Sequence, residues 1–211
     1  MRAVIVGHGP SIFGEKMGVE IDGFDVVIRQ KRCQETLKHP DYYGTRTDVV
    51  SGSWTIAKGL RGIPANEYWV FLDSRHNEVT EGQIDAMRAH FEPARCVIDE
   101  PLCSTWNEAY RALRTPYTLG EQMERKGTSD DRGHTHMSAG LHTLIYACSQ
   151  YDEVVLVGCD NLASGKFTWS VTRGPDWQKY PDHRWDIEHK MIPTIANHFD
   201  TKIGYLFPEA A

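Results

Sequence analysis

The stretch that decides the fold is residues 1–30, MRAVIVGHGPSIFGEKMGVEIDGFDVVIRQ. Its apolar run at 3–6 is typical of a strand that is buried on both faces of a parallel sheet. A glycine-containing turn at 7–11 ends this run, and extended apolar character returns at 24–28. Parallel sheets bind nucleotides just beyond the carboxyl ends of their strands, where glycines let the backbone approach a ligand. The chain therefore opens with a candidate nucleotide site.

The rest of the chain alternates between strand-like and helix-like segments. We expect strands near 2–6, 24–29, 48–52, 67–72, 95–98, 153–158 and 202–206, and helices near 54–61, 80–91, 104–114, 119–126, 139–150 and 184–197. This alternation predicts a single α/β domain over 1–211, with a mostly parallel sheet and helices on both faces. Thr80, Ser104 and Ser138 are the expected N-caps.

Two segments are predicted to be mobile loops. Residues 127–135 include the polar, glycine-flanked stretch GTSDDRG, and residues 160–182 are rich in glycine, proline and aromatic residues. The second is longer than a plain connection usually is, which favours a lid or a binding loop.

Composition limits the class of protein. The net charge of -6 over 211 residues disfavours a broad surface for nucleic acid. The sequence has neither an apolar run of ~18 residues nor a signal-peptide pattern, so we expect no membrane insertion. Its five cysteines are widely spaced and form no C-x-x-C motif, which argues against a disulfide framework and favours a reducing cytoplasm.

The first turn is not a dinucleotide-binding fingerprint. Ile12 occupies the position where that pattern needs its third glycine, and Pro10 supplies no backbone donor. A Gly-x-Gly pair after a first strand would also suit an S-adenosylmethionine-dependent methyltransferase. A tight turn without any ligand is the other alternative.

A second candidate segment is 136–162, HMSAGLHTLIYACSQYDEVVLVGCDNL. Ser138 precedes a helical pattern, so its hydroxyl and the free amides of Ala139 and Gly140 would face an anion at the start of that helix. The apolar strand that follows ends at residues 158–160, where ligands of parallel sheets bind. Alternatively, Ser138 is only an N-cap and the glycine at 158 only a turn residue.

A third segment is 180–192, YPDHRWDIEHKMI. If Asp182 caps a helix, His183 lies in its first turn, where the positive end of the helix favours the neutral imidazole that can accept a proton. His183 and Glu188 would lie about 140° apart around the helix, so they are not a metal-binding pair. No histidine spacing here is diagnostic of zinc, and we expect no metal. A surface histidine is the plain alternative.

Together the three segments resemble the sialyltransferases of glycosyltransferase family 29, in the same order. The opening VIVGHGPSIFG…EIDGFDVVIR is similar to the long sialylmotif, and its turn also resembles bacterial family 42. SAG…YDEVVLVGCD is similar to the short sialylmotif, and His183-x-x-x-x-Glu188 to the very short one. The turn at 44–48 lies where the family has a related turn. The resemblance covers most of the chain.

The resemblance implies a Rossmann-like domain of the GT-A-like sialyltransferase variant and a CMP-sugar donor, most simply of sialic acid or a related acidic sugar. Transfer to a hydroxyl of a glycan or other acceptor would invert the anomeric centre without metal or cofactor. His183 would be the general base, and Glu188 would support the site. The alternative is a CMP-binding module without transferase activity. The resemblance indicates neither the acceptor nor an oligomeric state.

The chain departs from the family where nucleotide-binding asparagines are usual. His8 replaces one, and Arg29-Gln30-Lys31 replaces an Arg-x-Asn pattern. His8 can still donate one hydrogen bond, and Lys31 could place a full charge on the phosphate. The donor-binding residues that the resemblance implies are Gly7, His8, Gly9, Pro10, Ser11, Arg29, Gln30, Lys31, Ser138, Ala139, Gly140, Gly158, Cys159, Asp160, Trp169 and Tyr180, with Tyr180 and then Trp169 expected near the leaving phosphate.

The animal enzymes join their long and short motifs by a disulfide. The matching positions are Ala3 and Tyr151, so this chain cannot form that bond. The resemblance nevertheless predicts that these two residues lie near each other, at the starts of neighbouring strands.

Overall fold

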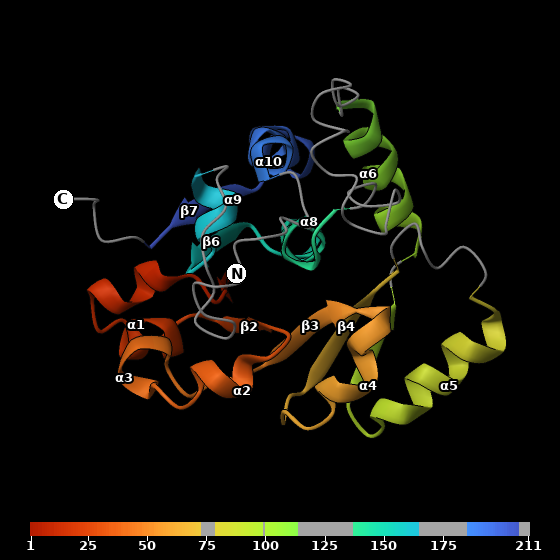
Figure 1. Ribbon diagram of the computed structural model, residues 1–211, viewed down its shortest axis with the longest axis horizontal. Coiled ribbons are helices and arrows are strands. Elements are labelled where there is room, and N and C mark those ends of the chain that lie inside the picture. Colours follow the sequence, from red (N-terminus) through yellow and green to blue (C-terminus); the bar gives the residue numbers. More distant parts are fainter. Residues whose placement is uncertain (73–78, 99, 114–136, 165–184, 207–211) are drawn as a thin grey trace, which may run out of the picture.

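The computed structural model describes residues 1–72, 79–98, 100–113, 137–164 and 185–206 (Figure 1). Seven strands in these residues form one sheet in the order β5-β4-β3-β2-β1-β6-β7, and every neighbouring pair is parallel. The α/β class and the parallel sheet are confirmed, and each strand lies within two residues of its expected bounds. The strands are β1 (Arg2–Val6), β2 (Val26–Gln30), β3 (Val49–Ser53), β4 (Glu67–Phe71), β5 (Arg95–Ile98), β6 (Glu153–Val157) and β7 (Lys202–Tyr205).

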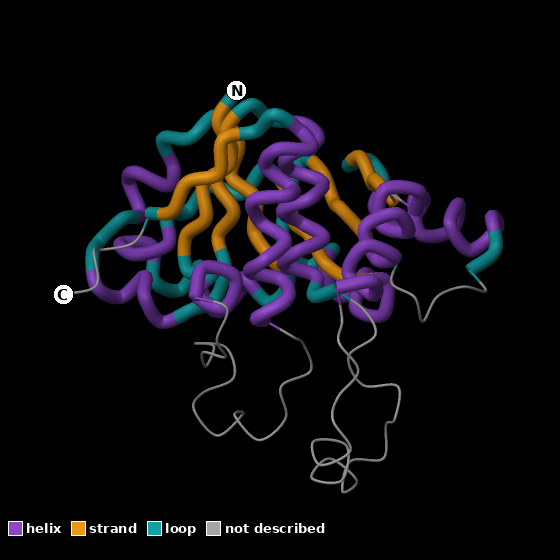
Figure 2. The backbone as a smooth tube through the Cα atoms, turned by 90° about the horizontal axis from the view of Figure 1, so that it is seen from above, coloured by secondary structure: helices purple, strands orange, loops and turns teal. Residues whose placement is uncertain are grey.

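Helices cover both faces of the sheet, as expected. On one face lie η1 (Pro10–Gly14), α1 (Gly18–Asp22), α2 (Cys33–Thr36), α3 (Pro40–Tyr43), η2 (Trp54–Ile56), α4 (Ala57–Leu60) and α5 (Glu81–Phe91) (Figure 1). On the other lie α6 (Glu100–Leu113), α8 (Ala139–Gln150), α9 (Asp160–Ser164) and α10 (Trp185–Phe199). Viewed from this second side, helices run alongside the strands rather than across them (Figure 2).

Strand β1 shows why its sequence is apolar throughout. Val4 and Val6 pack into the apolar cluster under η1, α1 and α3, whereas Ala3 and Ile5 pack into the cluster that α8 and α10 cover. Successive side chains of a strand point to opposite faces, so a strand covered on both sides needs an apolar residue at every position.

The order of the strands reverses between β1 and β6. The chain builds β1 to β5 in one direction and then returns to place β6 on the free side of β1. Ligands of open parallel sheets bind beyond the carboxyl ends of the strands at such a reversal. The turns at 7–11 and 158–160 both lie there, because they follow β1 and β6 directly.

The expected proximity of Ala3 and Tyr151 is confirmed. Arg2 pairs with Glu153 in the β1–β6 register, and Tyr151 precedes Glu153 by two residues. Both Ala3 and Tyr151 contribute to the same apolar cluster. The two positions therefore lie at the starts of neighbouring strands.

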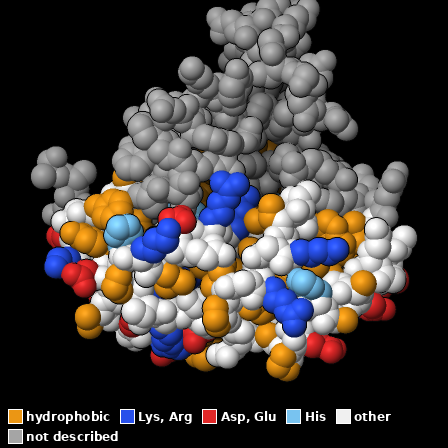
Figure 3. Space-filling model, turned by 60° about the horizontal axis from the view of Figure 1, so that its bottom comes forward, with side chains coloured by type: hydrophobic (Ala, Val, Ile, Leu, Met, Phe, Trp, Pro, Cys, Tyr) orange, Lys and Arg blue, Asp and Glu red, His pale blue; other side chains and the backbone are white. Residues whose placement is uncertain are grey.

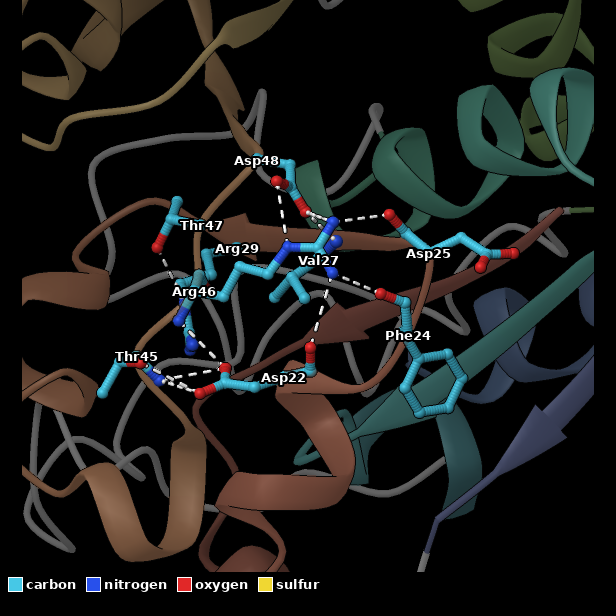
Figure 4. Close-up of polar contacts among 9 residues, drawn as sticks. All are labelled: Asp22, Phe24, Asp25, Val27, Arg29, Thr45, Arg46, Thr47 and Asp48. Carbon is cyan, nitrogen blue, oxygen red and sulfur yellow. Dashed lines mark hydrogen bonds and ion pairs between the residues drawn. The ribbon is translucent and has the colours of Figure 1, made fainter.

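The turn at 44–48 lies at the opposite, amino edge of the sheet, where a polar network holds it (Figure 4). Arg46 forms an ion pair of 2.9 Å with Asp48. The carboxylate of Asp22 accepts hydrogen bonds from the backbone and hydroxyl of Thr45 and from the backbone of Arg46, all at 2.9–3.0 Å. This turn therefore stabilises the fold away from the carboxyl edge.

Several helix boundaries differ from those expected. Helix α6 begins at Glu100, whereas the sequence predicted a start after the cap Ser104. Pro101 does not prevent the earlier start, since proline is tolerated in the first turn of a helix. Residues 160–164 form α9 rather than the start of a loop. Helices α1, α2 and α3 were not expected, since four or five residues are too few to show a helical period. The expected segments 119–126, 127–135 and 165–182 lie outside the described residues.

Two expected caps are confirmed. Thr80 forms a capping box with Gln83 at the start of α5. The hydroxyl of Ser138 accepts a hydrogen bond from the backbone N–H of Leu141, at 3.1 Å, at the start of α8.

Candidate functional site

The turns after β1 and β6 pack backbone against backbone. The N–H of Gly7 donates to the carbonyl of Val157 at 2.8 Å, and the N–H of Gly9 donates to the carbonyl of Gly158 at 2.6 Å. Gly158 has a φ of +60°, in the left-handed region that favours glycine. A Cβ on Gly7 would lie 2.3 Å from the carbonyl oxygen of Gly158, so only glycine fits there.

A Cβ on Gly9 would likewise lie 2.3 Å from the carboxyl carbon of Asp160. From the sequence, the glycines at 7 and 9 were expected to allow the approach of a ligand. In the structure, the close approach that they allow is to the connection between β6 and α9 of the same chain.

The carboxylate of Asp160 holds the first turn in place. It accepts a hydrogen bond of 3.0 Å from the backbone N–H of Ser11 and a second from the Ser11 hydroxyl. Pro10 has no N–H to offer. The first amide of η1 with a hydrogen is therefore already paired with a carboxylate, and this helix start is closed to a second anion.

Ser138 links the second and third candidate segments. Its backbone N–H donates to the carboxylate of Glu188 at 2.7 Å, and its hydroxyl donates to the other oxygen of that carboxylate at 2.6 Å. The hydroxyl proton of Ser138 is given to Glu188, and its oxygen caps α8. The Ser138 side chain therefore bonds to a carboxyl group of the same chain, whereas the sequence predicted that it would face a bound anion.

Glu188 is 0% exposed and lies in the first turn of α10. Burial raises the pKa of its carboxyl to about 7, and the two hydrogen bonds from Ser138 oppose this rise. Its oxygens contact the start of α8 rather than solvent. Glu188 therefore links α10 to the start of α8.

The start of α8 retains open backbone donors. Among the described residues, no group accepts a hydrogen bond from the N–H of Ala139 or Gly140, and both residues are half-buried. The side-chain amide nitrogen of Gln30 lies 3.1 Å from the position that a Cβ on Gly140 would take. The end of β2 therefore brings an amide side chain to the two free amides of the helix, a set of donors suited to an anion.

His8 connects the first turn to the end of β2. Its Nε2 lies 2.5 Å from the carbonyl oxygen of Lys31, and since a carbonyl can only accept, Nε2 carries the proton and donates. The N–H of Lys31 donates in turn to the carbonyl of Ser51 at 2.8 Å. His8 and Lys31, which stand where the sialyltransferases that the chain resembles usually have asparagine, thus contact each other.

Arg29 points to the opposite face of β2 from Gln30. Its fully buried guanidinium donates to the carbonyls of Arg46 and Tyr43 at 2.9 and 2.8 Å, and to the hydroxyl of Thr47 at 3.0 Å. Burial lowers the pKa of Arg29, although the neighbouring Cys33 and acidic groups act in the other direction. Arg29 therefore supports the segment that leads into β3 and is not brought to the other candidates.

Cys159 also points inward. Its buried thiol lies 3.7 Å from the carbonyl of Ile5, and burial raises the thiol pKa to about 12. Its side chain therefore belongs to the core beneath the turn.

One polar contact at this edge was missed by the sequence analysis. The hydroxyl of Thr143 donates to the hydroxyl of Ser51 at 2.9 Å and so ties α8 to β3. The available signal was Ser51 itself, a polar residue within the apolar run of a buried strand.

The structure thus brings most of the candidate residues to the carboxyl edge around β1, β2 and β6. These are Gly7, His8, Gly9, Pro10, Ser11, Gln30, Lys31, Ser138, Ala139, Gly140, Gly158, Asp160 and Glu188. Trp169, Tyr180 and His183 lie outside the described residues.

Further features of the described residues are their surface charge, the grouping of their metal-ligating side chains and the length and apolar character of their helices. On the face of α1 to α5, lysine and arginine side chains lie among acidic and hydrophobic ones (Figure 3). In the part of the chain that the structure describes, no three histidine, cysteine or carboxylate side chains gather as metal ligands would. Of the helices in that part, none combines the length and the apolar character that a membrane crossing requires.

No protein-family model matches this sequence, and a search of curated proteins finds no significant match.

Proposed function

We propose that this chain is an inverting, metal-independent glycosyltransferase that moves a sugar, most simply sialic acid or a related acidic sugar, from a CMP-sugar to an acceptor hydroxyl. The observation that supports this proposal is the convergence of segments that are far apart in the sequence. The turn at 7–11 contacts 158–160, and Ser138 contacts Glu188, all at the edge where the strand order reverses. These are the segments that resemble the sialylmotifs.

The donors at this edge favour a ligand with one phosphate. Of the helices that start at this edge, η1 is closed to an anion by the carboxylate of Asp160. Within the described residues, the N–H groups of Ala139 and Gly140 have no acceptor, so a phosphate at the start of α8 would accept hydrogen bonds from them, with the Gln30 amide beside them. The nucleotide of a CMP-sugar carries one such phosphate, whereas the pyrophosphate of a dinucleotide binds at the helix start after the first strand, which Asp160 closes here.

The reaction requires one base and one stabilised leaving group. In this proposal His183 removes the proton from the acceptor hydroxyl as its oxygen attacks the anomeric carbon. The bond from that carbon to the phosphate oxygen breaks, and CMP leaves as an anion that the amides at the start of α8 stabilise.

Glu188 acts in this mechanism as a positioning residue. It is buried, and its bonds to Ser138 fix the first turn of α10 against the start of α8. His183 precedes Glu188 by five residues in the sequence. The contact between Ser138 and Glu188 therefore fixes the position of the first turn of α10, which follows His183 in the sequence.

We place this activity in the reducing cytoplasm. Four cysteines in the described part of the chain, Cys33, Cys96, Cys148 and Cys159, are free thiols, which suits that compartment.

The experiment is a transfer assay on His183→Ala with a parallel titration of CMP. Loss of a general base should slow transfer by roughly 10²–10⁴-fold while the Kd for CMP stays unchanged. His90→Ala, which alters a half-buried histidine on α5, is the matched control and should retain full transfer. Full activity of His183→Ala would remove this residue from the mechanism.

A second candidate function is a nucleotide-binding module without transferase activity. The observation that favours it is the bond from His8 to the carbonyl of Lys31, which uses the ring proton that could otherwise reach a nucleotide. Binding of CMP together with no release of CMP from any CMP-sugar would select this alternative.

A further inference from the structure

Arg32 combines an unfavourable backbone conformation with a position at the candidate site. Its φ of 67° and ψ of 17° lie in the left-handed region. Among the described residues other than glycine, only Arg32 and Asp200 have a positive φ. This conformation is energetically unfavourable for a residue with a Cβ. Glycine adopts it without that cost, and asparagine and aspartate tolerate it better than other residues do.

The local structure gives arginine no compensation. Arg32 is the N-cap residue of α2, a position that favours serine, threonine, aspartate or asparagine, and its side chain makes no capping hydrogen bond. The side chain is exposed, and the described residues include no partner for its guanidinium. Another residue at position 32, such as asparagine or glycine, would therefore be more favourable both for the left-handed backbone and for the N-cap of α2.

The neighbours of Arg32 place it at the site. The residue before it, Lys31, receives the hydrogen bond of His8 through its carbonyl and bonds to Ser51 through its N–H. Two residues before it, Gln30 reaches the start of α8. The left-handed turn thus places an exposed guanidinium, with no partner in the described part of the chain, on the residue two positions after Gln30.

Asp200 provides the contrast. It follows the last residue of α10, Phe199, with a φ of 51°. The position just past a helix C-terminus is where a left-handed residue is ordinary. Its conformation therefore follows from helix termination, whereas that of Arg32 does not.

Residues with a strained backbone cluster at active sites and ligand-binding sites. We propose that Arg32 is a ligand-binding residue whose guanidinium binds the phosphate of the nucleotide. This inference rests on the proposed function. A guanidinium matches two phosphate oxygens at once, which an exposed lysine does not.

The test compares Arg32→Gly with Asp200→Gly in melting temperature and in the Kd for CMP and for cytidine, which lacks the phosphate. Both variants relieve a left-handed conformation, so both should fold, and Arg32→Gly should raise Tm by roughly 2–4 °C. Arg32→Gly should weaken CMP binding by roughly three- to tenfold and leave cytidine binding unchanged. Asp200→Gly should bind both ligands like the wild type.

Salt provides a second readout. The difference in CMP affinity between wild type and Arg32→Gly should shrink as ionic strength rises, because an exposed charge contact is screened. A purely structural role would not give this trend.

The outcomes separate the two proposals. If the wild type binds CMP and Arg32→Gly binds it equally well, or loses CMP and cytidine affinity alike, the role of Arg32 is wrong and the proposed function stands. If the wild type does not bind CMP, the proposed function is wrong, and the role of Arg32 is rejected with it.

Discussion

Glu188 accepts two hydrogen bonds from Ser138, a residue 50 positions earlier in the chain, through its backbone N–H at 2.7 Å and its hydroxyl at 2.6 Å. The carboxylate is fully buried, and α8 and α10 meet through it. The contact joins two helix starts at the edge where the β1 and β6 turns also meet. It is therefore the polar link around which the proposed site is organised.

Glu188→Gln should remove a pH dependence of stability. Burial raises the pKa of Glu188 from 4.5 to about 7 in the folded protein, so the fold binds this proton more tightly than the unfolded chain does. The stability that Glu188 contributes is fully present below pH 4.5 and is lost as pH rises through about 7. Glutamine keeps an acceptor for the Ser138 N–H and adds a donor for its hydroxyl.

The measurement is urea unfolding of both proteins at pH 5 and pH 8. The stability of Glu188→Gln relative to wild type should increase between these values by on the order of 2–3 kcal/mol. Glu108→Gln, at an exposed position on α6, should behave like the wild type. A difference between Glu188→Gln and wild type that stays constant with pH would show that Glu188 is already ionised at pH 5.

Gly7→Ala should destabilise the protein by more than about 2 kcal/mol, because the new methyl group would meet a backbone carbonyl that cannot turn away. Gly59→Ala is the matched control. Gly59 lies in α4, and a Cβ there would meet nothing within 4 Å, so alanine should stabilise by about 0.5–1 kcal/mol. Chemical denaturation measures both, and a Gly7→Ala protein as stable as wild type would contradict the packing of the two turns.

Two thiols should resist modification in the folded protein. Burial raises the pKa of Cys148 and that of Cys159 to about 12, so almost no thiolate forms at neutral pH. Alkylation at pH 8 followed by mass spectrometry should leave both unmodified until the protein is denatured. Rapid labelling of either in the native protein would mean that its side chain is not buried.

The sequence predicted the positions of the strands more accurately than it predicted the short helices and the contacts between side chains. All seven strands were expected because each is an apolar run that ends at polar or turn residues, and that signal is local. Helices of four or five residues, such as α2 and α9, give no such signal. They form because the chain must turn back from a strand end, which depends on tertiary structure.

The sequence predicted which residues lie at the candidate site better than it predicted what each of them contacts. Ser138 and Glu188 were both expected at the site, but no local pattern indicates that one donates to the other across 50 positions. Gly7 and Gly9 were attributed to a ligand because a glycine-rich turn after a strand looks the same whether a ligand or another turn approaches it. Alternation along β2 predicts that Arg29 and Gln30 face opposite sides, and the structure places them so.

The most direct test of the proposed CMP-sugar site is a thermal-shift titration of the wild-type chain with CMP and, in parallel, with UDP. A ligand that binds only the folded state stabilises it by a free energy that grows with the logarithm of ligand concentration above Kd, so Tm continues to rise there. We predict that CMP raises Tm progressively with its concentration and that UDP at the same concentration raises it far less. No shift with CMP, or an equal shift with UDP, would contradict the account.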